Sequence, residues 1–215
     1  MSDWSSRAEA YRNAPEQREG ADLDLIVRWA EGSRTALDVA TGGGHVARRL
    51  RDAGLQVVSA DPAPGMQPDV ICRAEDLPFA DGAFDLVVSR IAPHHFEDIR
   101  AAIGELERVS NRLVVIEDTL YISDQQEQAE RLRDPSHVRS RSEDEWKAVL
   151  TEAGLEVEQV EFFEKVHKLD DWLARTGCEG EEAARVTELL APQMVDDGSA
   201  WHDTKILLKG RKSQS

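Results

Sequence analysis

The chain has 215 residues, with 26 Lys and Arg against 42 Asp and Glu and a formal net charge of −16 at pH 7. Its length suits one α/β domain with a helical insertion. Binding to nucleic acid or to an anionic membrane surface needs clustered basic side chains, so the acidity argues against both partners.

Cysteine spacing and the distribution of apolar residues indicate the compartment. Cys72 and Cys178 are the two cysteines, and they have neither metal-site nor disulfide-framework spacing. No apolar run approaches the roughly 20 residues of a membrane-spanning helix, and residues 1–4 do not resemble a secretory leader. We therefore expect a soluble, cytoplasmic protein, either a monomer or a homodimer.

The apolar pattern changes period several times along the chain, as in alternating α/β proteins. After helices at 6–12 and 21–31, short apolar runs predict buried strands at 35–40, 56–60, 69–72, 84–89 and 112–117, with helices at 46–53 and 98–109 between them. Helices at 124–133, 143–153, 169–175 and 181–190 and strands at 156–163 and 204–209 complete the prediction.

This alternation predicts an α/β, Rossmann-like fold with a seven-stranded, mostly parallel sheet, helices on both faces and a small helical lid. We interpret residues 1–215 as a single domain. Within it we expect an N-terminal helical cover at 1–32 and a cofactor-binding core at 33–118. The lid and substrate-side helices, with one strand, occupy 119–203, and the last strand lies at 204–210.

A glycine loop follows the first predicted strand. Asp38 lies within that strand, and Thr41 precedes Gly42, Gly43 and Gly44 at the start of the next helix. Glycines allow close backbone approach to a ligand, and the helix N-terminus offers free N–H groups. Asp61, nineteen positions after Gly42, has the spacing of a ribose-binding carboxylate. A plain tight turn is the alternative.

The run Asp38-Val39-Ala40-Thr41-Gly42-Gly43-Gly44 resembles the acidic glycine loop of class I S-adenosylmethionine methyltransferases. Ala40 replaces the first glycine, a small departure provided that no positive φ is needed there. The resemblance implies S-adenosyl-L-methionine as cofactor and S-adenosyl-L-homocysteine as product. It also implies that the loop backbone lies under the methionine moiety.

Further stretches are similar to the ubiquinone/menaquinone-methyltransferase-like, or type 11, branch. Residues 61–66 resemble a segment in which Met66, after Asp61 and Pro62, lies against adenine, and residues 73–79 with 81–85 resemble a run ending LPF-x-D-x-x-F-D. Arg73 stands where the family has an Asp that accepts from the adenine amino group. The neighbouring residues assigned to the cofactor are Ala74, Glu75 and Asp76.

Adjacent histidines follow the fourth strand. His94 and His95 suit removal of a proton near neutral pH, which O-methylation of a phenol or C-methylation of an activated ring would need. The alternative is that alignment of acceptor, methyl and sulfur is enough and that no base is used. The family resemblance implies that Arg90 lies near the cofactor carboxylate and that His95, which we favour as the base, faces the substrate. The equally weighted alternative is that one His packs under the next helix and the other caps a loop. We expect no metal, because no third ligand has suitable spacing.

The cover of the site is expected from the N-terminal helix and from residues 118–140. The resemblance implies that Tyr11 closes over the cofactor; anchoring of a frayed helix is the alternative. The Arg- and His-containing run at 131–139 either binds an anionic acceptor or forms a salt-bridged hinge, and we favour the hinge.

These observations predict methyl transfer to a small-molecule acceptor, with O- or C-methylation favoured over N-methylation. One alternative is a catalytically silent cofactor-binding or partner protein. An NAD-dependent oxidoreductase is less favoured, since positions 45 and 47 are His45 and Ala47 rather than glycine. A protein or nucleic-acid methyltransferase has the same fold, but the charge disfavours nucleic acid.

Overall fold

The computed structural model describes residues 4–13 and 18–213 of the chain. The helices in this part are α1 (Trp4–Asn13), α3 (Ala21–Trp29), α4 (His45–Asp52), α5 (Ile99–Val109), α6 (Asp124–Arg133), α7 (Glu143–Glu152), α8 (Leu169–Ala174) and α9 (Gly180–Leu189). The strands are β1 (Thr35–Val39), β2 (Gln56–Asp61), β3 (Val70–Ile71), β4 (Phe84–Arg90), β5 (Ser110–Thr119), β6 (Leu155–Lys168), β7 (Met194–Val195) and β8 (Ala200–Lys212). Short 3₁₀ turns are η1 (Pro64–Met66), η2 (Pro93–His95), η3 (Ala191–Gln193) and η4 (Asp196–Gly198).

The strands form one sheet in the order β3-β2-β1-β4-β5-β8-β6, with β7 paired to β8. Strands β1 to β5 pair in parallel, whereas β8 is antiparallel to both β5 and β6. The predicted Rossmann-like, mostly parallel sheet is therefore confirmed. The described chain has eight strands where seven were expected, because β7 has only two residues and gives no alternating pattern.

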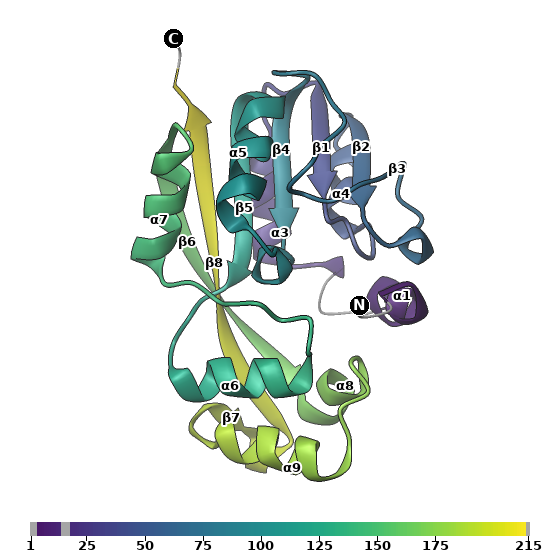
Figure 1. The fold of residues 1–215 in the computed structure, drawn as a ribbon, viewed down its shortest axis with the longest axis vertical. Coiled ribbons are helices and arrows are strands. Elements are labelled where there is room, and N and C mark those ends of the chain that lie inside the picture. The colour runs from purple at the N-terminus through teal and green to yellow at the C-terminus, as the bar shows by residue number, and fades with distance from the viewer. Residues whose placement is uncertain (1–3, 14–17, 214–215) are drawn as a thin grey trace.

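Helices cover both faces of this sheet (Figure 1). On one face, Leu23 and Ile26 of α3 and Leu50 of α4 belong to a buried cluster with side chains of β4, β5 and β8. On the other face, Ile103 of α5 and Trp146 of α7 join a second cluster with the same strands. Strands covered on both sides must be apolar at successive positions, which explains the uninterrupted apolar runs in the sequence.

Strands β6 and β8 are longer than predicted and continue past the sheet as a two-stranded ribbon (Figure 1). Helices α6, α8 and α9 pack on this extension around a core of their own that includes Ala129, Trp172, Val186 and Trp201. We call α6 together with residues 165–204 the lower lobe. The carboxyl ends of β1, β2, β4 and β5 point toward α1 and the lower lobe, and this is the edge at which open α/β sheets bind ligands.

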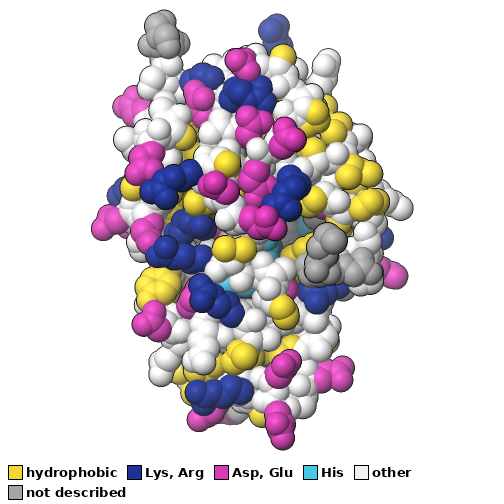
Figure 2. All heavy atoms as spheres, in the orientation of Figure 1, with side chains coloured by type: hydrophobic (Ala, Val, Ile, Leu, Met, Phe, Trp, Pro, Cys, Tyr) yellow, Lys and Arg dark blue, Asp and Glu magenta, His cyan; other side chains and the backbone are white. Residues whose placement is uncertain are grey.

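None of the helices in the described residues is both long and apolar enough to cross a membrane. Acidic and basic side chains are interspersed over the face of the molecule drawn in Figure 2. Histidine side chains show at the waist between the sheet and the lower lobe in the same view.

Candidate active site

Asp38 fixes the glycine loop through hydrogen bonds to its carboxylate. Its side chain is buried at the end of β1, where Oδ2 accepts hydrogen bonds from Thr41 Oγ1 at 2.5 Å and from the Ala47 amide at 3.0 Å. Burial raises the pKa of Asp38 to about 6. The carboxylate thus joins the loop to the first turn of α4, which explains a charged residue inside a buried strand.

The loop backbone is shaped for close approach. Gly42 and Gly44 have φ of 50° and 72°, and a Cβ built on either would meet no atom within 4 Å. The loop therefore presents bare backbone to open space at these two positions. Ala40, which replaces the first glycine of the family loop, was expected to have a negative φ. Its φ is 54°, so it occupies the left-handed region, where a Cβ costs roughly 1–2 kcal/mol.

Asp61 links the glycine loop to the segment after β2. It is 7% exposed, and Oδ2 accepts from the Gly42 amide at 3.0 Å while Oδ1 accepts from the Ala63 amide at 2.9 Å. Burial raises the pKa of this carboxyl. A carboxylate has about four lone-pair positions, so each oxygen keeps acceptor capacity for a further donor at the sheet edge.

Helix α1 lies over this edge and contacts both loops. The Gly65 amide donates to Ser5 Oγ at 3.0 Å, and Arg12 Nη1 donates to the Gly65 carbonyl at 2.9 Å. Next to Arg12, in the last turn of the helix, the Tyr11 carbonyl oxygen lies 3.0 Å from His45 Nε2. Met66 is buried in a cluster with Ala8 and Ala63, against which Trp4 and Tyr11 pack.

The segment after β3 places the remaining predicted cofactor residues. Ala74 is buried in the core and Asp76 is exposed, while Pro62 is exposed after β2. Glu75 Oε1 accepts from the Glu97 amide at 3.0 Å and from Arg73 at 3.3 Å. Arg73 also lies 3.1 Å from Glu97. The positive charge of Arg73, at the position where the family has an Asp, is therefore paired with two carboxylates.

Arg90 lies in a buried ion-pair network. Its Nη2 is 2.5 Å from Asp22 Oδ2, and its Nε is 2.8 Å from Glu117 Oε2. Lys165 Nζ reaches the other oxygen of Asp22 at 2.8 Å. Burial would raise the pKa of Asp22, but Arg90 and Lys165 outweigh it and hold that pKa below its usual range. These contacts join α3 to β4, β5 and β6, and they engage the guanidinium that the resemblance assigns to the cofactor.

The two histidines have different surroundings. Nδ1 of His94 lies 2.5 Å from Oδ1 of Asp118, and both side chains are buried. His95 Nδ1 instead lies 3.1 Å from Ser136 O and from Ser136 Oγ, and its ring meets Trp4 edge-on with centroids 4.7 Å apart. A carboxylate orients His94, whereas loop and aromatic contacts hold His95.

The protonation of this pair is set by burial. Burial lowers the pKa of His94 well below its ordinary value, with the nearby His137 adding to the shift, and burial raises the pKa of Asp118 to about 7. The pKa of His95 is lowered well below its ordinary value by burial and then by His94. His94 is therefore a neutral imidazole near pH 7, able to accept a proton.

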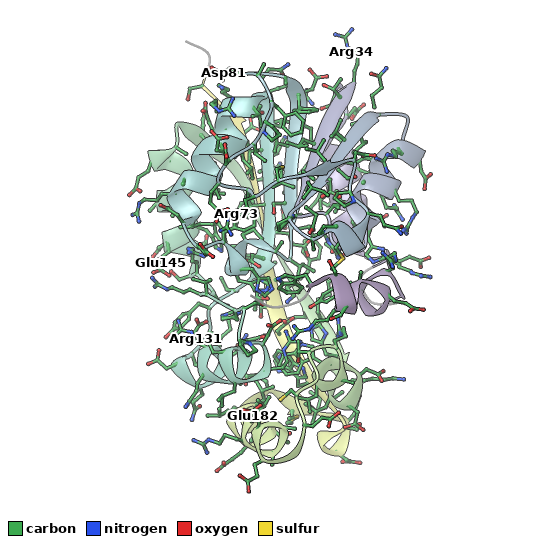
Figure 3. All side chains as sticks on the ribbon, turned by 45° about the vertical axis from the view of Figure 1, so that its right-hand side comes forward. Arg34, Arg73, Asp81, Arg131, Glu145 and Glu182 are labelled. Atoms are coloured by element: carbon green, nitrogen blue, oxygen red, sulfur yellow. The ribbon has the colours of Figure 1, made fainter. Side chains whose placement is uncertain are left out.

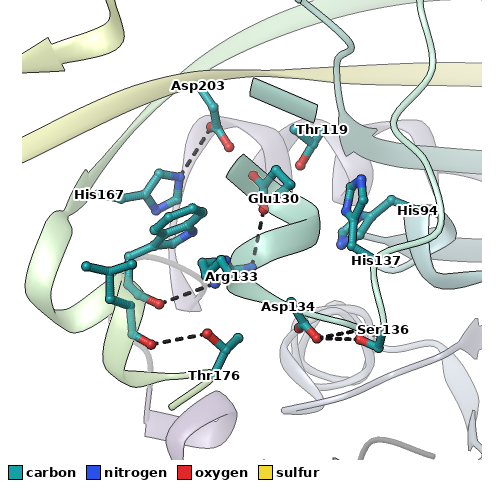
Figure 4. Close-up of polar contacts among 12 residues, drawn as sticks. His94, Thr119, Glu130, Arg133, Asp134, Ser136, His137, His167, Thr176 and Asp203 are labelled. Atoms are coloured by element: carbon teal, nitrogen blue, oxygen red, sulfur yellow. Dashed lines mark hydrogen bonds and ion pairs between the residues drawn. The ribbon is translucent and has the colours of Figure 1, made fainter. Parts of the chain in front are cut away.

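A small cavity of about 50 Å³ lies between the sheet edge and the lower lobe. Its walls come from α1, from the ends of β4 and β5, from η2, from the β6–β8 ribbon and from α6 and α8. The lining residues are Tyr11, Ile91, His94, His95, Thr119, Glu130, Arg133, Lys165, His167, Trp172, Arg175 and Lys205. Figure 4 shows several of them around this space.

The structure brings the predicted residues to two adjoining places. The glycine loop, Asp61 and Met66 lie along the edge covered by α1, while Tyr11, His94 and His95 line the cavity. Sequence reasoning missed Asp118 and His167 as site residues, and it considered Arg133 only within the run 131–139, for which a hinge was favoured over binding of an anionic acceptor. The position of Asp118 at the end of a buried strand is the same signal that singled out Asp38.

Ile91 is a further residue that sequence reasoning missed. It lines the cavity with φ of 51°, directly after β4, and its amide donates to the Glu117 carbonyl at 2.7 Å. A β-branched residue in the left-handed region is a backbone outlier of the kind that gathers at functional sites. No group of three or more His, Cys, Asp or Glu side chains in residues 4–13 and 18–213 is arranged to hold a metal ion.

Comparison with known proteins identifies the chain's relatives. Residues 37–112 match the family described as a methyltransferase domain. The chain is 29% identical over 207 residues to the uncharacterized methyltransferase YcgJ of Bacillus subtilis, across 85% of this chain and 82% of the relative. The solved structure of YcgJ superposes with a TM-score of 0.80 at 26% identity, covering 90% of this chain and 99% of that one.

A demethylmenaquinone methyltransferase of Thermus thermophilus is 38% identical over 124 residues, which are 46% of this chain and 56% of that protein. The chain thus spans about half the length of this relative. Fold, glycine loop and relatives together define a class I S-adenosylmethionine-dependent methyltransferase. Within that class, residues 37–112 match the type 11 methyltransferase domain, and the relatives similar to part of this chain include demethylmenaquinone methyltransferases. These relatives give no support to the NAD-dependent oxidoreductase alternative.

Residues at the sheet edge fit the cofactor of this class. The open backbone at Gly42 and Gly44 is a cradle that side chains would fill. Asp61, between the two loops, keeps acceptor capacity for a diol. When bound, S-adenosylmethionine supplies a sulfonium-activated methyl group, and the residues described above would bind and orient it.

Proposed function

We propose that this methyltransferase acts on a small-molecule acceptor held in the cavity between the sheet and the lower lobe, with His94 taking the acceptor's proton. The observation that carries the proposal is the position of His94. It lines the cavity, and its Nδ1 is 2.5 Å from the buried Asp118. This geometry favours His94 over His95, which sequence reasoning prefers.

The hydrogen bond to Asp118 gives the imidazole a defined role. With Nδ1 engaged, Nε2 is the nitrogen available to accept a proton. In the transfer, an acceptor atom forms a bond to the methyl carbon, the carbon–sulfur bond breaks with its electron pair remaining on sulfur, and the acceptor's proton passes to His94. A hydroxyl or an activated carbon needs that proton removed, whereas a neutral amine attacks through its own lone pair. A buried base therefore favours O- or C-methylation.

The cofactor would lie along the edge beneath α1. We propose that the backbone of Thr41 to Gly44 supports the methionine moiety, that Asp61 accepts from the ribose hydroxyls and that Met66 lies against adenine. Tyr11 is proposed to separate cofactor and acceptor from solvent, because it packs near Met66 and also lines the cavity. Alignment of acceptor, methyl and sulfur by these walls is a main source of rate in such a transfer.

The test is turnover with labelled S-adenosylmethionine against phenols, quinols and small amines, using His94→Gln and His95→Gln. The exposed His202, whose ring pairs with Glu164, provides the control variant His202→Gln. We expect His94→Gln to lower kcat by about 10²-fold or more, with cofactor affinity by calorimetry unchanged, and the control to match wild type. An unchanged kcat in His94→Gln would overturn the base role, and turnover confined to amines would overturn the O- or C-methylation preference.

A further inference from the structure

The charged side chains that line the cavity are mostly basic, although the chain as a whole is acidic. Acidic side chains outnumber basic ones by 42 to 26 in the whole sequence. Among the residues that line the cavity, however, the basic side chains are Arg133, Arg175, Lys165 and Lys205, and the single acidic one is Glu130. A concave, mostly enclosed surface lined by one sign of charge favours a ligand of the opposite sign.

Arg133 is a buried basic residue of the cavity wall whose polar contacts are long. It is 9% exposed, at the end of α6, with its guanidinium 4.0 Å from the centroid of the Trp172 ring. Nη1 donates to the Trp172 carbonyl at 3.3 Å, and Nη2 lies 3.4 Å from Glu130 Oε2. Charge-assisted hydrogen bonds are usually about 2.7–2.9 Å long, so both contacts are loose.

One donor of this guanidinium is left over. Arg133 Nε is buried and has no hydrogen-bond partner among the residues that the structure describes. An unsatisfied buried donor costs about 1–3 kcal/mol and is rare in folded proteins. Figure 4 shows the side chain between Glu130 and α8, with the cavity beside it. Stacking on Trp172 fixes the plane of the guanidinium, so the free donor has a defined direction.

His167 belongs to the same walls and is paired with Asp203. It is 8% exposed on β6, and neither ring nitrogen has a hydrogen bond within the described residues, although Nε2 lies 3.3 Å from Asp203 Oδ1. Lys205 differs, because its Nζ is satisfied by Thr119 Oγ1 at 2.7 Å and Asp203 Oδ2 at 2.6 Å. Arg133 Nε and His167 Nδ1 are thus buried nitrogens of the cavity walls that have no hydrogen-bond partner within the described residues.

We propose that the methyl acceptor carries a carboxylate, and that Arg133 binds it through its free Nε–H and the loosely held Nη2. A planar guanidinium matches the two oxygens of a carboxylate, and a fixed plane lowers the cost of orienting it. Arg133 then acts as a specificity residue that places the rest of the acceptor against His94. The inference rests on the proposed function, since it identifies the substrate class of the same cavity.

The test uses acetate and acetamide as a matched pair of probes that differ in charge but not in shape. Nitrogen-15-labelled protein, saturated with S-adenosylhomocysteine, is titrated with each at constant ionic strength maintained with sodium chloride. The Arg133 Nε–H resonance and the amides of residues 130–134 are followed. We expect acetate to shift these signals in a saturating manner and to bind at least about tenfold more tightly than acetamide.

Arg133→Gln and Arg131→Gln are the matched variants. Arg131 is also on α6 but points outward (Figure 3), with a side chain 54% exposed and paired to Glu127. Loss of the acetate response in Arg133→Gln, with an unchanged response in Arg131→Gln, would support the proposal. Equal responses to acetate and acetamide, no response to acetate, or an unchanged response in Arg133→Gln would overturn it.

Inorganic phosphate is the third probe, because arginine also binds phosphate. Phosphate binding more tightly than acetate would overturn the carboxylate assignment. None of these titrations requires methyl transfer, so they fail or succeed independently of turnover. An acetate response in a protein that methylates none of the tested acceptors would leave the carboxylate site standing while the proposed function fails. Turnover of neutral acceptors without an acetate response would leave the proposed function standing while the carboxylate site fails.

Discussion

His94 and Asp118 come from different elements, η2 and β5, yet their Nδ1 and Oδ1 atoms lie 2.5 Å apart in the protein interior. Burial raises the pKa of Asp118 to about 7 and lowers that of His94. Two groups coupled this closely titrate as a pair. The form with Asp118 ionised and His94 neutral is the one that can act as a base.

The first prediction concerns Asp118→Asn. We expect kcat/KM of the wild type to rise with pH through about 7. The variant should lose that inflection and turn over roughly 100-fold more slowly, because Asn cannot stabilise an imidazolium. A pH–rate series on both proteins measures this. Asp124→Asn, which changes an exposed carboxylate bonded to Tyr121, is the control, and an inflection that persists in Asp118→Asn contradicts the role of the pair.

The second prediction concerns the ribose. Asp61→Asn removes the charge between the two cofactor loops but keeps one oxygen for a backbone amide. We expect S-adenosylmethionine affinity to fall by about tenfold or more, since a hydrogen bond to a charged group contributes about 1.5–3 kcal/mol. Calorimetry measures this. Asp69→Asn, at an exposed carboxylate that accepts from Ser59, should bind as wild type, and equal losses in both variants would point to general destabilisation instead.

The third prediction tests α1 as the cover of the cofactor edge. A Cβ at Gly65 would lie 2.5 Å from Ser5 Cα and 2.7 Å from the Ser5 carbonyl oxygen, so Gly65→Ala must displace the helix. We expect cofactor affinity to fall by roughly tenfold and cleavage by protease near residue 12 to become faster. In Gly104→Ala, within α5, the new methyl meets nothing within 4 Å. That variant should bind normally, and normal binding in Gly65→Ala as well would argue against α1 as a cover.

The fourth prediction follows from φ of 54° at Ala40. Ala40→Gly removes the steric strain of an Ala in the left-handed region, but it also increases the conformational entropy of the unfolded chain. We expect a net gain of about 0.5–1 kcal/mol in the free energy of unfolding. Urea unfolding measures it. Ala47→Gly, buried within α4, should lose about 1 kcal/mol or more. A loss of stability in Ala40→Gly would show that the loop needs the methyl group.

The sequence was sufficient to predict the sheet and the position of the glycine loop at the end of β1, because both depend on local patterns. Most positions of the buried parallel strands are apolar, and Asp38 and Asp61 place charges near the carboxyl ends of β1 and β2. The His94–Asp118 pair depends instead on the register that sets Arg90 opposite Glu117, and no local pattern encodes that register. Arg133 could not be placed either, since the polar ends of β6 and β8 that carry the lower lobe give no strand pattern.

The last prediction concerns the network behind the cavity, where Glu117 is fully buried and 2.8 Å from Arg90 Nε. Burial raises the pKa of Glu117 from 4.5 to about 7. Between these values the unfolded chain has released a proton that the folded chain still holds, so this residue makes stability fall as pH rises through that window. Glutamine cannot ionise, so Glu117→Gln should not show that part of the fall.

The free energy of unfolding of Glu117→Gln, relative to wild type, should therefore increase by up to about 3 kcal/mol between pH 4.5 and pH 7. Urea unfolding at several pH values measures the difference, with Glu164→Gln as the exposed control. Arg90 keeps Asp22 as a partner in the variant, so the guanidinium is not left unpaired. A difference that stays constant with pH would mean that Glu117 ionises in the folded protein as it does in water, and that Arg90 fully offsets its burial.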